Sequence, residues 1–180
     1  YESEDSSGNK TILSAGSAYV FEKNNAGNWI PVHKITAEDR GEGDQFGFSV
    51  SISGEAIIAG APFEDEDANF TNTLISAGSA YVFERKDDNR WWWVAKLIAS
   101  DRNTGDNFGI SVSISGDKAI VGAPTEDEDE LGGASMTSSG SAYIFKLIND
   151  PNSGGWRQIQ KIAASDRAAT DWFGFSVVVS

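Results

Sequence analysis

The sequence predicts an all-β protein built from a repeated unit of four antiparallel strands. The tetrapeptide Gly-Ser-Ala-Tyr begins at Gly16, Gly78 and Gly140, each 62 residues after the one before. The dipeptide Phe-Gly recurs at Phe46, Phe108 and Phe173, and Gly-Ala-Pro follows the first two copies. No apolar pattern with the period of an α-helix extends over a helical length. Repetition at this period is typical of β-propeller blades and β-solenoids.

Each repeat contains four apolar or alternating stretches separated by turn residues. Residues 46–53 alternate serines with Val50 and Ile52, which indicates a strand with two different faces. Residues 56–61 are apolar on both faces, which is typical of a buried strand. Asn24, Asn25 and Gly27 form a hairpin signal before Trp29. We expect strands over residues 15–22, 29–36, 46–53, 56–61, 78–85, 91–98, 108–115, 118–123, 140–147, 156–163 and 173–180.

These strands divide the chain into about three repeats. Residues 1–45 are expected to form a partial repeat with the outer two strands of a blade, and residues 46–107 and 108–172 two complete repeats. Residues 173–180 would be the first strand of a further repeat, so the chain is a partial propeller or a segment of a longer array. The small residues of the Phe-Gly strands favour a propeller over a solenoid, with the Trp strands outermost. The open edges at both ends are expected to promote association with other chains.

Composition restricts the classes of partner. The 180 residues carry a formal net charge of −13, with an isoelectric point near 4.3, and contain no cysteine. Such a surface repels phosphate groups, so nucleic acid and anionic membranes are not expected partners. No apolar run reaches the length of a membrane-spanning helix, so no membrane insertion is expected. Disulfides and thiolate metal sites are excluded.

The order Phe-Gly, Gly-Ala-Pro and Gly-Ser-Ala-Tyr-Val-Phe, as in Phe46–Phe83, resembles the FG-GAP repeat. That repeat builds the seven-bladed propeller at the head of integrin alpha chains and occurs in bacterial and algal surface proteins. The resemblance implies a propeller fold and an extracellular or cell-surface location. Integrin-like repeats carry an Asp-rich calcium loop between Phe-Gly and Gly-Ala-Pro, where this chain has only short turns at Gly54 and Gly116. The bacterial-type repeat is therefore the closer likeness.

Two acidic loops are candidate calcium sites. Residues 64–67 read Glu-Asp-Glu-Asp and residues 126–130 read Glu-Asp-Glu-Asp-Glu. Ca²⁺ prefers several carboxylate and carbonyl oxygens in a flexible loop. Alternate residues of an extended loop point the same way, so the expected ligands are Asp65, Asp67, Asp127 and Asp129. The alternative is that both loops are simply solvated, because neither has the full spacing of an EF-hand.

Other candidate sites are surface features, and none is catalytic. Trp92 and Trp93 stand where the other copies have no tryptophan, so they are candidates for contact with a protein or a sugar. Asn9 and Asn69 lie in sequons for N-glycosylation. The recurrent Asp-Arg pairs, such as Asp39-Arg40, are expected to be architectural. Because no Ser–His–Asp or Cys–His arrangement can be built, we expect no enzyme.

The sequence therefore predicts a non-enzymatic, extracellular repeat segment that mediates adhesion or contact with other protein chains, and with carbohydrate as a further partner. One alternative is a structural subunit of a surface filament. A weaker alternative is the accessory domain of a secreted hydrolase.

Overall fold

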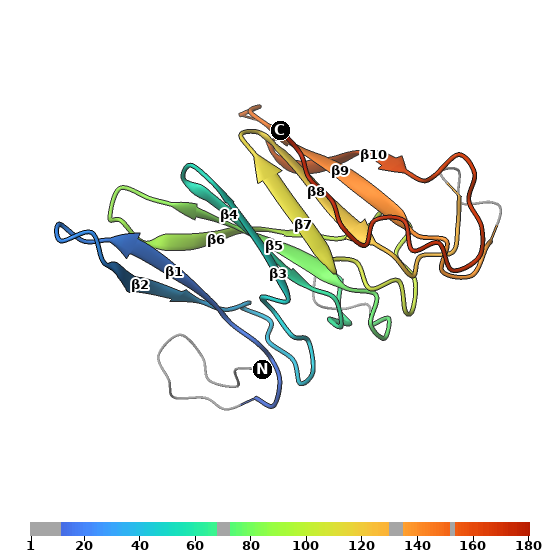
Figure 1. Ribbon diagram of the computed structural model, residues 1–180, viewed down its shortest axis with the longest axis horizontal. Coiled ribbons are helices and arrows are strands. Elements are labelled where there is room, and N and C mark those ends of the chain that lie inside the picture. The colour runs from blue at the N-terminus through green and yellow to red at the C-terminus, as the bar shows by residue number, and fades with distance from the viewer. Residues whose placement is uncertain (1–11, 68–72, 130–134, 152–153) are drawn as a thin grey trace.

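The computed structural model describes residues 12–67, 73–129, 135–151 and 154–180, and over these ranges it contains ten β-strands and no helix (Figure 1). The strands are β1 (Ala18–Lys23), β2 (Trp29–Ile35), β3 (Ser49–Ser53), β4 (Ala56–Ala61), β5 (Ser79–Arg85), β6 (Trp91–Leu97), β7 (Ser111–Ser115), β8 (Lys118–Ala123), β9 (Ser141–Ile148) and β10 (Gly155–Ile162). The predicted all-β class is confirmed. The described residues contain no helix that is both long enough and apolar enough to cross a bilayer.

The strands form three antiparallel sheets that follow one another along the chain. The first sheet contains β1 and β2, the second has the order β3-β4-β5-β6, and the third has the same order from β7 to β10. Figure 1 shows the three sheets side by side, with the two-stranded sheet at one end. Each four-stranded sheet corresponds to one predicted repeat, which agrees with propeller-like blades.

The core lies between neighbouring sheets. On β4, Ile57 packs with Val20 and Ile35 of the first sheet, whereas Ile58 faces Val112 of the third sheet. This strand is buried on both faces because sheets cover it from both sides, as its uninterrupted apolar sequence predicts.

The predicted strand starting at Phe46 begins three residues later, at Ser49. Gly47 has a φ of 83°, which turns the chain away from extended geometry. Phe46 makes only an isolated parallel bridge to Gly16, and its buried ring lies 5.5 Å from the ring of Tyr81. The Phe-Gly pair therefore anchors the corner before the strand instead of belonging to it.

Residues 173–180, which were predicted to be a strand, are not in a ladder. Phe173 bridges Gly140, and the N–H of Val179 donates to Oγ of Ser113 on β7. A strand requires a paired neighbour, and this sequence contains no third equivalent of β4 and β8 to pair with this segment.

Candidate functional site

The two glycines that define the repeat motifs meet across the junction between sheets. Gly60 belongs to Gly-Ala-Pro of the second sheet, and Gly109 to Phe-Gly of the third. A Cβ placed on Gly60 would lie 2.0 Å from the carbonyl oxygen of Gly109. A Cβ on Gly122 would lie 1.8 Å from the carbonyl oxygen of Gly174. The motif glycines are thus required by the close approach of two backbones.

Serine side chains form hydrogen bonds between β3 and β7 and between β7 and residues 174–179. The hydroxyl of Ser49 donates to the carbonyl of Gly109 over 2.8 Å. Further along, Oγ of Ser51 accepts a hydrogen bond from the N–H of Ile114 over 3.2 Å. Ser111 and Ser113 make the equivalent bonds to residues 174 and 179. The alternating serines of β3 and β7 are therefore contacts between sheets.

A buried ionic network lies at the junction of the first and second sheets. Nζ of Lys96 lies 2.6 Å from Oδ2 of Asp39 and 2.8 Å from Oε1 of Glu64. The hydroxyl of Tyr81 donates to Oδ2 of Asp39, and that of Ser79 donates to Oε2 of Glu64. Asp39 follows β2 whereas the other four residues belong to the second repeat, so the network ties the two sheets together.

The junction of the second and third sheets repeats this arrangement. Nζ of Lys161 lies 2.7 Å from Oδ2 of Asp101 and 2.9 Å from Oε1 of Glu126, and the hydroxyl of Ser141 donates to Glu126. At the first junction, burial raises the pKa of Glu64 to about 7, although the hydrogen bonds from Lys96 and Ser79 favour its ionised form. Recurrence at two junctions identifies the network as part of the repeat architecture.

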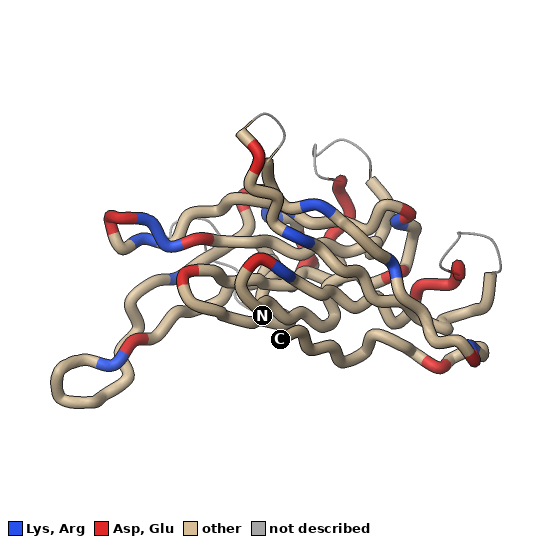
Figure 2. The backbone as a smooth tube through the Cα atoms, turned by 90° about the horizontal axis from the view of Figure 1, so that it is seen from above, with Lys and Arg blue, Asp and Glu red and all other residues tan. Residues whose placement is uncertain are grey.

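The predicted calcium ligands lie in loops that are braced by hydrogen bonds. Oδ1 of Asp65 accepts from the N–H of Ser76, and Oδ1 of Asp127 accepts from the N–H of Ser138. The guanidinium of Arg102 donates to the carbonyl of Asp65. Asp67 and Asp129 are half-buried in the same loops. Figure 2 shows acidic residues concentrated in loops and turns. Ca²⁺ binding by these four aspartates stays a prediction.

The loops before Phe46 and Phe108 each contain a buried carboxyl group with a raised pKa. Asp106 accepts a hydrogen bond from the N–H of Asn103, and Asp44 accepts one from Gly41. Burial, opposed by the backbone hydrogen bond and reinforced by nearby Glu126, raises the pKa of Asp106 to about 7. Burial likewise raises the pKa of Asp44 to about 6.

This raised pKa predicts that Asp106 makes the protein more stable as the pH falls. Between about pH 4 and pH 7 the folded state binds a proton at Asp106 that the unfolded state does not, so stability is lost as the pH rises through about 7. The Asp106→Asn variant should reduce the gain in unfolding free energy between pH 8.5 and pH 5.5 by about 1–2 kcal/mol. Urea unfolding at both pH values measures this gain, with Asp87→Asn on an exposed turn as the control. An unchanged gain in Asp106→Asn would contradict the assignment.

Trp92 and Trp93 lie differently on β6. The indole of Trp92 is half exposed, and its Nε1 points to the carboxylate of Asp88 at 3.3 Å. Trp92 also lines a cleft of about 550 Å³ with His33 and Arg90. Trp93 packs partly buried against the core between the first two sheets. Asn9 and Asn69, the predicted glycosylation sites, lie outside the described residues.

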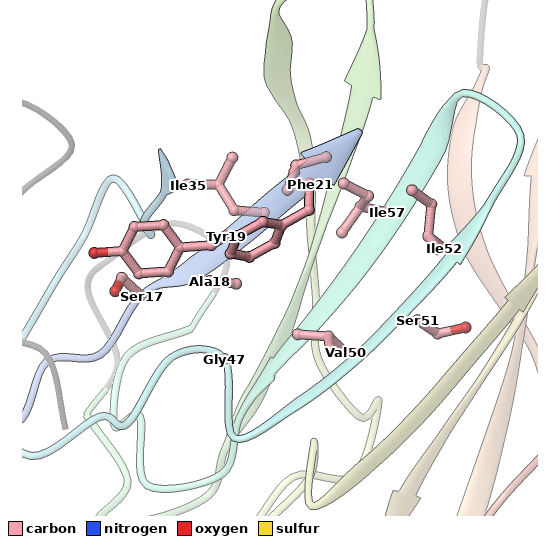
Figure 3. Close-up of a pocket in the computed structure, with 11 residues that line it drawn as sticks. Ser17, Ala18, Tyr19, Phe21, Ile35, Gly47, Val50, Ser51, Ile52 and Ile57 are labelled. Atoms are coloured by element: carbon pink, nitrogen blue, oxygen red, sulfur yellow. The ribbon is translucent and has the colours of Figure 1, made fainter. Parts of the chain in front are cut away.

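An apolar groove of about 370 Å³ runs between β1 and β3, lined by Ala18, Phe21, Val50, Ile52 and Ile57 among others (Figure 3). Its residues have counterparts one repeat later that are buried. Phe21 is 50% exposed whereas Phe83 is 4% exposed, and Ile52 is 59% exposed whereas Ile114 is 4% exposed. Phe83 pairs with Ile57 of β4 and lies in the core between the first two sheets, whereas Ile114 lies with Ile58 of β4 in the core between the second and third sheets. Within the described residues, the first sheet has no counterpart of the hairpin β3–β4, and the groove lies where that hairpin would pack.

Sequence reasoning missed the Lys-Glu-Ser part of the ionic network. Lys34, Lys96 and Lys161 recur at the same place in the Trp strands, and Glu64 and Glu126 stand two residues after Gly-Ala-Pro. The recurrence of these lysines and glutamates from repeat to repeat was the signal that could have predicted the network. The acidic loops were instead interpreted as exposed clusters of carboxylates. The structure instead buries the first glutamate of each loop.

Comparison with known families agrees with this architecture. The family model described as the FG-GAP repeat matches residues 29–83, 91–145 and 156–180, which together cover well over half of the chain. No curated protein matches the chain. With three matched repeats, and with the motif glycine pairs Gly60–Gly109 and Gly122–Gly174 in close approach, this chain belongs to the FG-GAP repeat family.

Proposed function

We propose that the chain is a non-enzymatic contact module of an extracellular or cell-surface protein, and that it binds other protein chains through the open face of its first sheet. Membership of the FG-GAP family supports the proposal of an extracellular contact module, since such repeats occur in adhesion-type extracellular proteins. The observation that supports binding of another protein chain is the apolar groove between β1 and β3.

The rest of the chain provides a template for the occupant. At the next junction the equivalent surface is filled by a hairpin, β3–β4, whose second strand pairs with β5 in antiparallel register. Its serines accept hydrogen bonds from the N–H groups of Ile114 and Gly116. The corresponding groups on the open side are the edge of β1, the N–H of Ile52, which lines the groove, and the N–H of Gly54 just after β3. The fitting partner is therefore a hairpin of the Phe-Gly…Gly-Ala-Pro type from a neighbouring FG-GAP repeat, which adds to the sheet by strand addition.

The experiment supplies that hairpin in trans. A peptide with the sequence of Phe108–Pro124, fused to a soluble carrier, is titrated into the 180-residue chain and followed by calorimetry. Saturable binding is expected, with a negative heat-capacity change because apolar side chains such as Phe21 and Ile52 become buried.

Two matched controls make the titration specific. The hairpin with Gly122→Val should not bind, because its side chain would meet the backbone carbonyl of Gly47, the counterpart of the close approach between Gly122 and Gly174. The Ile52→Asp variant of the chain should lose binding because it places a charge in the groove. Equal binding of both hairpins would reject the proposed site.

A surface filament is the alternative that a specific observation favours. Phe175 and Val178 are exposed on the segment 173–180, so a second copy could associate there as well as at the groove. Sedimentation over a hundredfold concentration range separates the two functions: a filament subunit forms a growing series of oligomers, whereas a contact module does not. The cleft beside Trp92 supports carbohydrate as a further partner, because indoles stack on sugar rings.

We also propose that Ca²⁺ stabilises the acidic loops. Clustered carboxylates repel one another, and an ion that binds only the folded form stabilises it by mass action. Millimolar Ca²⁺ should therefore raise Tm by more than NaCl of matched ionic strength. The loop aspartates Asp65, Asp67, Asp127 and Asp129 are the ligands that the sequence predicts.

A further inference from the structure

We infer that the cleft between β2 and β6 binds an acidic saccharide, a sugar chain such as a uronic acid oligomer that carries a carboxylate on its rings. This inference rests on the carbohydrate partner proposed above and names its chemical class. The cleft of about 550 Å³ is lined by His33 of β2 and by Arg90, Trp91 and Trp92 at the start of β6, among others. A smaller cleft of about 190 Å³ shares three of these residues and adds Trp93. Volumes of several hundred Å³ are typical of pockets for small ligands.

Polar side-chain groups at the cleft are available to a ligand. Nε1 of Trp93 is buried and has no hydrogen-bond partner among the described residues. Over the same part of the chain, the guanidinium of Arg90 forms no ion pair and the imidazole of His33 forms no hydrogen bond. A buried N–H without a partner is unfavourable, and an acceptor oxygen of a bound sugar would satisfy it.

The lining of the larger cleft is basic although the whole chain is strongly acidic. The net charge is −13, yet this lining contains no acidic side chain. The ammonium of Lys34, which also lines it, lies 5.8 Å from the ring of Tyr19, so the guanidinium of Arg90 is the cation that an anion would meet. Asp88 accepts hydrogen bonds from the N–H of Arg90 and from Nε1 of Trp92, which holds this turn. A guanidinium binds a carboxylate through two parallel hydrogen bonds.

The aromatic lining favours a sugar over an acidic peptide. A sugar ring has an apolar face of C–H groups that stacks on an indole, while its hydroxyl groups reach hydrogen-bonding partners at the rim. The indole of Trp92 is half exposed and can be covered in this way. Glu38 lines the smaller cleft, so we expect the sugar carboxylate to lie at the end of the site nearest Arg90.

The cleft residues do not recur at the next junction. The positions of His33, Arg90, Trp92 and Trp93 are taken there by Ala95, Gly155, Arg157 and Gln158, respectively. The buried lysine–glutamate pair, by contrast, is present at both junctions. Side chains that the repeat architecture requires should recur, so this set serves a purpose that is specific to the first junction.

Two trimers that differ only in charge test the inference. One is a trimer of galacturonic acid, and the other is its carboxyl-reduced form, a galactose trimer with the same linkages. Each is titrated into the 180-residue chain and followed by tryptophan fluorescence and calorimetry. At low salt the acidic trimer should bind at least about tenfold more tightly than the neutral one, because its ion pair with Arg90 is charge-assisted. High salt should reduce this preference.

Two pairs of variants assign the contacts. Arg90→Gln should reduce the preference for the acidic trimer to within about twofold. Lys86→Gln is its control, because Lys86 lies in the same turn but pairs with Glu84 and does not line the cleft. Trp92→Ala should weaken both trimers about tenfold through loss of stacking, whereas Trp29→Ala, which removes an exposed indole outside the cleft, should change both by less than about twofold. Circular dichroism checks that each variant is folded.

The outcomes are distinguishable. If neither trimer binds, the proposed carbohydrate partner fails together with this inference. If both bind equally, the carbohydrate partner stands and the acidic class is wrong. Equal losses in Arg90→Gln and Lys86→Gln would show a general effect of charge and overturn the site. A tripeptide of glutamic acid that binds as tightly as the acidic trimer would show that the cleft recognises carboxylates without a sugar, which would also overturn the inference.

Discussion

Gly60→Ala should destabilise the protein by about 3 kcal/mol or more. The added methyl group would lie 2.0 Å from the carbonyl oxygen of Gly109 and 2.5 Å from Oγ of Ser49. The oxygen of Gly109 is a backbone atom two residues before β7 of the neighbouring sheet, so relief of the overlap requires the two sheets to separate. That movement would also weaken the hydrogen bond from Ser49 to Gly109.

Urea unfolding measures this effect as a lower midpoint. Gly54→Asn is the control, because Gly54 has a φ of 57° and a side chain added there would meet open space, and asparagine tolerates this backbone conformation. The control should cost less than about 1 kcal/mol. If both variants unfold at the same urea concentration, the close approach of the two motif glycines does not limit the packing of the sheets.

Lys161→Met is expected to have an effect of similar size, about 3–5 kcal/mol, because it removes the cation of a buried network. Nζ of Lys161 lies between Asp101 and Glu126, and Glu126 is completely buried. Methionine fills similar volume but leaves two carboxylates that repel each other. The pKa of Lys161 is raised despite the opposing effect of burial, because Asp101 and Glu126 hold its charged form.

Lys146→Met on neighbouring β9 is the matched control. That lysine is half exposed and lies 3.8 Å from Asp117, a separation at which a surface ion pair contributes less than about 1 kcal/mol. Adding Glu126→Gln to Lys161→Met should recover part of the lost stability, since it removes an unpaired buried charge. Equal losses in Lys161→Met and Lys146→Met would show that the network does not stabilise the junction.

The repeat made most of the fold predictable from sequence. A period of 62 residues, alternating strands and turn glycines indicated antiparallel four-stranded units, and the sheets β3-β4-β5-β6 and β7 to β10 confirm that class. Strand beginnings were less accurate. Phe46 and Phe48 have strong strand propensity, but Gly47 between them adopts a positive φ and turns the chain.

The candidate site was harder to predict because its residues are distant in sequence. Asp39 and Lys96 are in different repeats, and only the docking of two sheets brings them into contact. The acidic residues of each loop also differ in environment, although they are adjacent: Glu64 is buried, whereas Asp65 braces the loop through Ser76. The alternating direction of side chains along an extended loop could not predict which carboxylate is buried, because the packing of the neighbouring sheets decides it.

The central claim is that the groove is a docking site for a hairpin of another repeat. The most direct test is amide hydrogen exchange at Ile52 and Gly54. Their counterparts Ile114 and Gly116 donate to serine hydroxyls of the preceding sheet, whereas Ile52 lines the open groove and Gly54 follows two residues later, just after β3. Saturation with the Phe108–Pro124 hairpin should slow exchange at both amides by at least about tenfold, while the Gly122→Val hairpin leaves them unchanged. Unchanged exchange at Ile52 and Gly54 under saturating hairpin, or protection confined to other strands, would contradict the claim.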